Sequence, residues 1–287
     1  MGDDTSTFVM AGVNTYTGFT RIGGGKLTFT GNGRWGVPNS TGVALTSSPN
    51  GTVICNGSTS SLRVDFNGTS QVTGGLSGNG GVFANNAPDT LSTLTVGAAN
   101  ISNTVWPTGG SGQNGKMVDN TTGTGGILGL TKTGTGTIGI PTAQNEYSGP
   151  TLINNGILEF TATGAPSPNS DHQINTPGQL KLSYDGTRNI NGLFINGVRQ
   201  PDGVYSAATH PDFITGNGTL TIAQVHPTCP AVLGVTGSAN SVLLGWTGVG
   251  VLQSSPDLDT WTNLPGASSP FAAAAVPGQK MYYRVKQ

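Results

Sequence analysis

Two stretches of the chain, NTYTGFTRIGGGKLTF at residues 14–29 and NEYSGPTLINNGILEF at residues 145–160, align without a gap. Eight of the sixteen positions are identical, including Tyr16, which recurs as Tyr147, and a closing Gly-x-Leu-x-Phe. A shortened form of the same ending, GTLTI, returns at residues 218–222. Recurrence at a fixed internal spacing is the signature of a repeat architecture, so we expect the chain to be built from stacked units.

Short segments alternate between apolar and polar residues along almost the whole chain, as in KLTF at 26–29, ILEF at 157–160 and LKL at 180–182. This period of two is typical of strands with one buried face. Ten Asn-Gly pairs separate such segments, and both residues tolerate the positive φ of tight turns. No window of a dozen residues carries a helical apolar stripe, so the chain is predicted to be all-β.

The type of β architecture is harder to predict, because Asn-Gly turns by themselves favour antiparallel hairpins. Short, evenly spaced segments and a recurring unit instead favour a parallel β-solenoid over residues 1–223, with coils of roughly 20 to 25 residues. Such coils stack like residues on like, and only 9% of the residues are charged. The side chains predicted to point inward are Ile22, Leu27, Phe29, Ile153, Leu158, Phe160, Leu220 and Ile222.

The second copy of the unit has a longer context that is similar to a known family. LTKTGTGTIGI at residues 130–140, followed by NEYSGPTLINNGIL at 145–158, resembles the autotransporter-associated (passenger-associated) β-strand repeat. With drift, the resemblance extends over about residues 6–223. It implies a secreted, right-handed parallel β-helix that is displayed at the surface of a bacterium or outside it. MGDDTSTF at the start lacks the basic and hydrophobic regions of a secretory signal.

The composition changes after residue 223. VHPTCP at residues 225–230 predicts a linker, assigned to residues 224–231, and residues 232–287 predict a small module of four or five strands. This module resembles the fibronectin-type-III-like modules of bacterial surface proteins, but it is one or two strands short of the seven in a sandwich of this kind. Its core candidates are Trp246, Trp261, Tyr282 and Tyr283.

Charge and motifs exclude several classes of function. A net charge of −1 with scattered Lys and Arg argues against nucleic acid and anionic membranes as partners, and no apolar run has the length of a membrane span. The spacing of His172, His210 and His226 fits no metal site, and we expect surface or turn positions for them. We expect no cofactor and no metal.

Three other local patterns have ordinary explanations. The GTGTIG at residues 134–139 spells a dinucleotide fingerprint but no helical pattern follows it, so we interpret it as a chance match. Asp257 and Asp259 predict a turn that solvates two carboxylates, with a calcium site as the alternative. Cys55 and Cys229 fit no metal motif, and the sequence leaves their pairing open.

An enzyme is the third hypothesis, because parallel β-helices include polysaccharide lyases and glycoside hydrolases. Those reactions need closely placed carboxylates, whereas Asp65, Glu159 and Asp185 are expected on different coils. Trp35 and Trp106 suit either sugar stacking or the plugging of a coil end. We therefore predict a non-enzymatic structural protein, with a carbohydrate-binding adhesin module as the second hypothesis.

Assembly with itself is the last expectation. Residues 6–12, STFVMAG, occupy the place of a repeat strand without a capping helix before them, and the C-terminal module is expected to lack a strand. Each deficiency can satisfy the other between two copies, which gives head-to-tail filaments. An alternative is that the chain is a gene fragment. The predicted assembly residues are Thr7, Phe8, Val9, Met10, Tyr282, Tyr283 and Val285.

Overall fold

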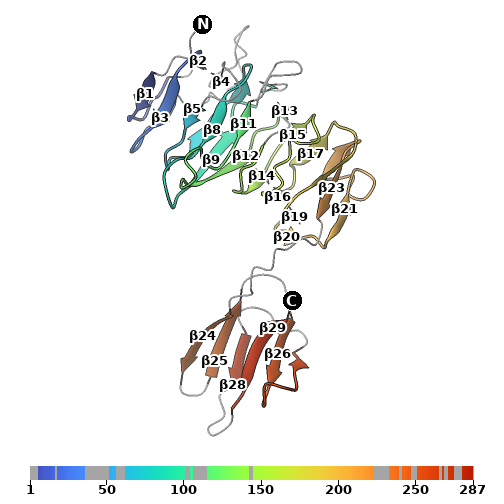
Figure 1. Ribbon diagram of the computed structural model, residues 1–287. Coiled ribbons are helices and arrows are strands. Elements are labelled where there is room, and N and C mark those ends of the chain that lie inside the picture. The colour runs from blue at the N-terminus through green and yellow to red at the C-terminus, as the bar shows by residue number, and fades with distance from the viewer. Residues whose placement is uncertain are drawn as a thin grey trace. The chain divides into compact units, whose positions relative to one another are not determined.

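The computed structural model describes residues 6–16, 18–35, 52–55, 62–100, 104–105, 115–141, 145–222, 233–238, 241–246, 251–264, 267, 271–274 and 280–286. The chain divides into two units, Met1–Ala223 and Gln224–Gln287, and each is described by itself (Figure 1). Every regular element among the described residues is a β-strand, so the all-β prediction is confirmed.

Three main sheets form the first unit. The first sheet contains β1 (Thr7–Met10), β3 (Lys26–Phe29), β5 (Leu62–Asp65), β8 (Val82–Ala84) and β11 (Lys116–Met117) in that order. The second sheet contains β6 (Gln71–Val72), β9 (Leu91–Val96), β12 (Ile127–Lys132), β14 (Thr151–Ile153), β16 (Asp171–Ile174), β19 (Gly192–Ile195) and β20 (Val198–Arg199). The third sheet contains β10 (Thr104–Val105), β13 (Thr137–Ile140), β15 (Ile157–Phe160), β17 (Gln179–Leu182) and β22 (Ile214–Gly216).

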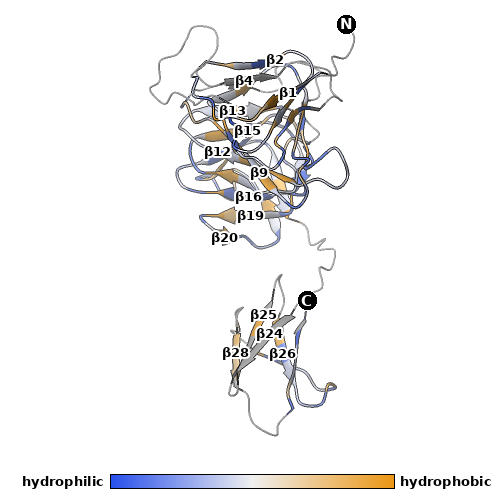
Figure 2. Cartoon of the chain, turned by 90° about the vertical axis from the view of Figure 1, so that its left-hand side faces the viewer, coloured by the Kyte–Doolittle hydropathy of each residue, from blue (hydrophilic) through white to orange (hydrophobic). Residues whose placement is uncertain are grey.

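Two smaller sheets complete this unit. One contains β2 (Thr20–Ile22), β4 (Thr52–Cys55) and β7 (Gly75–Ser77), and the other contains β18 (Thr187–Asn189), β23 (Thr219–Ile222) and β21 (Gly203–Tyr205). From β8 to β13 the chain visits the first, second and third sheets in turn, twice over, so each of these two coils places one strand in each sheet. From β14 to β17 the described strands alternate between the second and third sheets. Figure 2 shows the strands as stacked rungs. Apart from the β19–β20 and β21–β23 pairs, the strand pairs of this unit are parallel, which confirms the solenoid prediction.

The register shows how long a coil is. Leu130, Thr151, His172 and Leu193 occupy equivalent positions of successive strands in the second sheet, at steps of 21 residues. Leu94 pairs with Leu130, a step of 36 residues, so this coil is longer than those that follow it. Adjacent parallel strands lie about 4.8 Å apart, so equivalent side chains of successive coils are in van der Waals contact.

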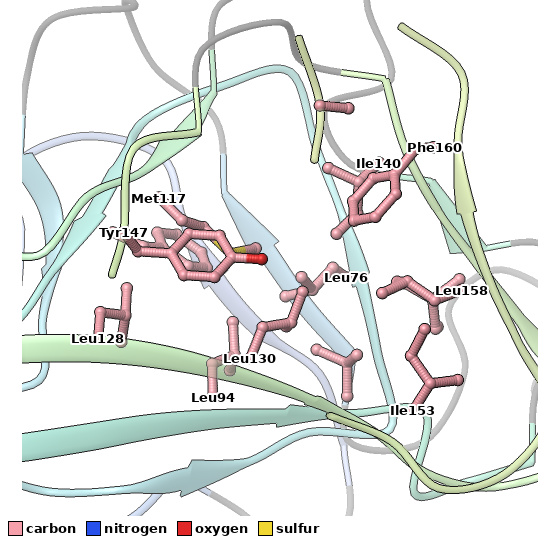
Figure 3. Packing of buried hydrophobic residues seen from close by; sticks show 14 of the residues in the cluster. Leu76, Leu94, Met117, Leu128, Leu130, Ile140, Tyr147, Ile153, Leu158 and Phe160 are labelled. Carbon is pink, nitrogen blue, oxygen red and sulfur yellow. The ribbon is translucent and has the colours of Figure 1, made fainter. Parts of the chain in front are cut away.

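The interior of the coils is packed with apolar side chains. All eight residues named as inward-pointing are buried, and Phe29, Ile153, Leu158, Phe160 and Leu220 are completely inaccessible to solvent. Figure 3 shows Leu158, Ile153 and Leu130 pointing into the same interior space. Alternation along each strand produces this packing, because β3, β15, β17 and β23 all repeat the pattern of a half-buried residue followed by a buried one.

The two copies of the repeated unit share local structure. The Tyr16 hydroxyl lies 2.6 Å from Thr20 Oγ1, and the Tyr147 hydroxyl lies 2.8 Å from Thr151 Oγ1. Asn14 and Asn145 each donate a side-chain hydrogen bond to a carbonyl 20 residues further along, on the next coil. The copies nevertheless belong to different sheets, since β3 lies in the first sheet and β15 in the third. The repeat therefore specifies a corner with its two flanking strands rather than a fixed face of the solenoid.

The second unit consists of two three-stranded antiparallel sheets. One contains β24 (Leu233–Ser238), β25 (Ser241–Trp246) and β28 (Phe271–Ala274), and the other contains β27 (Thr262–Asn263), β26 (Val251–Ser255) and β29 (Tyr282–Lys286). Its core includes Leu244, Leu252 and Ala273, against which Tyr283 packs. Trp261 and Tyr282 are half-buried outside this core, so the prediction of core positions for them was wrong. The side chain of Trp246 lies outside the described residues.

Truncating a core side chain tests the register. Leu158→Ala is expected to lower the free energy of unfolding by about 2 to 5 kcal/mol, because it leaves a cavity in a close-packed interior. Leu152→Ala, on a half-buried position of the neighbouring strand β14, is the matched control and should cost clearly less. Urea denaturation followed by circular dichroism measures both, and equal losses would contradict the assigned faces.

Candidate functional site

A line of core residues crosses the first sheet and ends at an exposed phenylalanine. Strand register aligns Met117, Phe83, Val64, Leu27 and Phe8, one from each strand. The first four are at most 4% exposed, whereas Phe8 is 65% exposed. Phe8 therefore has the position of a core residue, and the coil that would cover it is absent among the described residues.

The backbone of β1 also has one open edge. Ser6 and Met10 accept hydrogen bonds through their carbonyl oxygens from the backbone N–H groups of Lys26 and Thr30, 2.8 and 3.1 Å away. In a parallel pair, alternate residues direct both backbone groups to the same side, so Thr7 and Val9 direct theirs away from β3. Among the described residues, β1 pairs with β3 alone.

Apolar side chains gather near this edge. Phe8, Val9, Val13, Tyr16 and Phe19, all within twelve residues of one another, are between 38% and 65% exposed. Met10 is half-buried and packs against the core, so its side chain is less available than predicted for an assembly residue. An open strand edge beside exposed apolar side chains is the arrangement that natural proteins usually cover.

At the opposite end of the solenoid, two of the sheets end in reversed strands. The Asn196-Gly197 turn, with both residues at positive φ, reverses the chain so that β20 pairs antiparallel with β19. β21 likewise pairs antiparallel with β23. Reversed strands thus end the second sheet and the small β18-β23-β21 sheet, whereas the third sheet ends in β22, which pairs parallel with β17. At the other end, the first sheet ends in the parallel strand β1.

In the second unit, β29 is an edge strand. It pairs with β26 over five residues, from Tyr282–Ser255 to Lys286–Val251, and with no other described strand. Tyr283 packs inward, and alternation along the strand places Tyr282 on the outer face. The side chain of Val285 lies outside the described residues. The structure thus shows two strand edges on the predicted assembly residues, one in each unit.

The carboxylates considered for catalysis are dispersed. Asp65 accepts backbone hydrogen bonds from Asn67 and Asn86. Glu159 is paired with Lys181 at 2.9 Å, and although burial raises its pKa, the hydrogen bonds from Ser183 and Lys181 lower the pKa overall. Asp185 borders a shallow surface hollow. Among the described residues, no three His, Cys, Asp or Glu side chains converge as metal ligands.

The remaining motif residues have structural roles. Trp35 is 3% exposed, donates from Nε1 to the Val72 carbonyl at 2.7 Å and lies edge-on to Phe29, so its ring is not available to a sugar. The glycine-rich residues 134–136 form the turn before strand β13. The Asp257 carboxylate accepts hydrogen bonds from the N–H groups of Asp259 and Thr260, which lower its pKa. Cys229, His226 and Trp106 lie outside the described residues, and Cys55 belongs to β4.

Sequence reasoning missed a buried lysine. Lys132 is completely buried, and its ammonium group donates to the carbonyls of Thr133, Gly134 and Asn155 at 2.5, 2.8 and 3.0 Å. Burial lowers its pKa to about 8. Because the carbonyl of Asn155 belongs to the following coil, this lysine ties two coils together at a corner. The signal in the sequence was the lysine of LTKTG, which interrupts an otherwise apolar position of the strand.

His172 was wrongly expected at the surface or in a turn. It lies in β16, is completely buried, and contacts the Ser170 carbonyl through Nδ1 at 3.1 Å. Its Nε2 has no hydrogen-bond partner among the described residues. Burial lowers its pKa to about 4, with the positive charge of Arg188 as a further cause.

Protonation of His172 should destabilise the solenoid in acid. Its folded pKa of about 4 lies below the ordinary value of 6.5, so the unfolded chain binds more protons between these two values. The contribution to stability is complete above pH 6.5 and is lost as the pH falls towards 4, by about 3 kcal/mol. His172→Leu should remove this loss. Urea denaturation of the parent and the variant at pH 7, 5 and 4 measures the free energy of unfolding of each protein, and the difference between them gives the contribution of His172.

A second histidine provides the control for that experiment. His210 lies beside Tyr205 near a turn, with ring centroids 5.1 Å apart. His210→Leu should leave the acid dependence of the parent protein in place. The assignment to His172 is wrong if the two variants respond to pH in the same way.

Comparison with known proteins identifies the repeat. Residues 3–29 and 130–160 match the model of the passenger-associated-transport-repeat. No curated protein and no solved structure matches the chain. Within the described residues, no helix is long and apolar enough to cross a membrane. The match confirms the resemblance found in the sequence, because each matched range contains one copy of the repeated unit.

Proposed function

We propose that this passenger-associated-transport-repeat protein is a structural protein of the bacterial exterior that assembles head to tail into filaments. The single observation that carries the proposal is the exposed end of the core line at Phe8, beside the open edge of β1. The proposal assigns no reaction, cofactor or metal to the chain. It places the protein outside the cell on the strength of the repeat, and it takes the coil to be right-handed, as βαβ-type crossovers almost always are.

The second unit supplies the complementary edge. Its strand order, β24-β25-β28 and β27-β26-β29, supports a fibronectin-type-III-like sandwich with six strands. In this assignment β29 is the sixth strand, which in a complete sandwich pairs with the seventh and last strand. A seventh strand would therefore pair with the free edge of β29. We infer that β1 of a second copy takes this position.

The two edges suit each other in length and chemistry. β1 has four residues and β29 has five, and β1 (TFVM) contains no charged side chain that would oppose pairing with the cationic β29. Strand addition supplies main-chain hydrogen bonds, while neighbouring apolar side chains such as Phe8 and Met281, 65% and 47% exposed, supply burial. A contact between different surfaces of two identical copies leads to an open filament unless rotation closes it into a ring.

Blocking the outward N–H of β1 tests this joint. Val9→Pro removes a backbone donor that faces the open edge, and proline is tolerated on edge strands. The variant is expected to stay monomeric at concentrations at which the parent chain forms fibres. Sedimentation velocity and negative-stain electron microscopy compare the two.

Val9→Ala is the matched control, because it shortens the same side chain and keeps the N–H group. It should still form fibres. Fibres of unchanged form from the Val9→Pro protein would exclude β1 as the joint, and a parent chain that stays monomeric at high concentration would exclude the filament itself. Equal melting temperatures of both variants would show that the β1–β3 pair is intact.

A further inference from the structure

The outer face of the β27-β26-β29 sheet carries a row of linked polar side chains. Strand register places Asn263, Gln253 and Arg284 side by side, one on each strand. Gln253 donates from Nε2 to Asn263 Oδ1 at 2.6 Å and accepts from Arg284 Nε at 2.8 Å. Gln253 is only 5% exposed, so its two hydrogen bonds hold both neighbours in fixed positions.

Arg284 is positioned from a second side. Its guanidinium carbon lies 4.1 Å from the centroid of the Trp261 ring. The indole is itself held, since its Nε1 donates to the Leu258 carbonyl at 2.9 Å. The hydrogen bond from Nε to Gln253 and the position of the guanidinium over the Trp261 ring hold this group from two sides.

The outward end of this arginine is available. Among the described residues, its two Nη groups have no hydrogen-bond partner and no carboxylate lies within ion-pair distance. Arg284 is exposed on the surface. An oriented guanidinium with both terminal nitrogens open matches the bidentate geometry of a carboxylate.

The surroundings favour a polymer over a single small anion. Lys286 follows Arg284 by two residues, so it lies on the same face about 7 Å along the strand. Tyr282 precedes Arg284 by the same step, and its half-buried ring offers an apolar surface beside the cations. The exposed amide group of Asn263 adds hydrogen-bonding atoms of the kind that contact hydroxyls, while the buried Gln253 holds Asn263 and Arg284 in place.

We propose that this face, made of Tyr282, Arg284, Lys286, Gln253, Asn263 and Trp261, binds an acidic polysaccharide through the carboxylates of its uronic acid residues. Arg284 binds a carboxylate with its two Nη groups, Lys286 attracts a neighbouring carboxylate of the same polymer, and Tyr282 contacts an apolar face of a sugar ring. The binding is a property of the second unit's outer face, distinct from the β29 edge assigned to assembly.

Titration of the full chain with polygalacturonate tests the proposal, using isothermal calorimetry or affinity electrophoresis. The parent protein should bind the acidic polymer, and binding should be lost with fully methyl-esterified polygalacturonate, which keeps the sugar ring without its charge. Arg284→Lys should weaken binding by about tenfold or more, because lysine keeps the charge but loses the planar fork and the stacking.

Lys280→Gln is the matched control, because it removes one exposed charge of the same segment outside the row. It should change the affinity by less than about twofold, and the monomeric Val9→Pro protein should bind like the parent chain. The proposal is overturned if Arg284→Lys binds like the parent, if Lys280→Gln loses as much as Arg284→Lys, or if the esterified polymer binds equally well. Unchanged near-ultraviolet circular dichroism of each variant would show that a loss of binding is not a loss of folding.

Discussion

The structure of the first unit depends on parallel strands that stack in register, each hydrogen-bonded to the equivalent strand of the next coil about 4.8 Å away. Each residue then meets the equivalent residue of the next coil, and apolar positions reinforce one another along lines such as Phe8, Leu27, Val64, Phe83 and Met117. Like charges in such a line would repel, which gives a physical reason for the low charge content. The ion pair described in this unit obeys the same rule, since Glu159 and Lys181 are register partners of opposite charge on adjacent coils.

The corners impose a stricter condition than the strands. A Cβ atom on Gly134 would lie 2.0 Å from the Gly97 carbonyl oxygen, and one on Gly156 would lie 2.4 Å from the Gly134 carbonyl oxygen. Gly97, Gly134 and Gly156 also have positive φ. Successive coils thus approach closely at one corner, where only glycine fits. The glycine of the repeated Gly-x-Leu ending, at positive φ as Gly25 and again as Gly156, follows from this condition.

These two constraints explain how much the sequence predicted. Alternation and the repeated Gly-x-Leu-x-Phe ending identified strands and buried residues, because those patterns are local: Leu27 and Leu158 are both buried. The sheets could not be assigned, because the step between equivalent residues varies from 21 to 36 and the two copies of the repeat lie in different sheets. His172 and Lys132 were missed for a different reason. A polar residue at an inward position is identified only by the register, and carbonyl groups rather than complementary side chains hold both.

In the second unit, the sequence identified the strand of Tyr282 and Tyr283 but not which ring is buried. Two adjacent aromatic residues of one strand must face opposite sides, and the pattern alone does not say which side is the core. The row from Asn263 through Gln253 to Arg284 was equally hidden, because its members come from three separated segments and only strand pairing aligns them.

The two ends of the solenoid differ in whether their last strands have neighbours to pair with. In a linear array of coils, each coil is stabilised by its neighbours, so a terminal coil is the least stable part of the stack. At one end, antiparallel β20 and β21 provide a neighbour from the same chain. At the other end, β1 has a neighbour on one side among the described residues, and Phe8 remains 65% exposed.

Any strand that pairs with β1 therefore gains burial for itself and also stabilises the coil beneath it. By mass action, such binding raises the stability of the terminal coil as the concentration of the partner increases. In the proposed assembly, association and folding of this coil are therefore one equilibrium, which is the physical reason for proposing the contact between copies at β1.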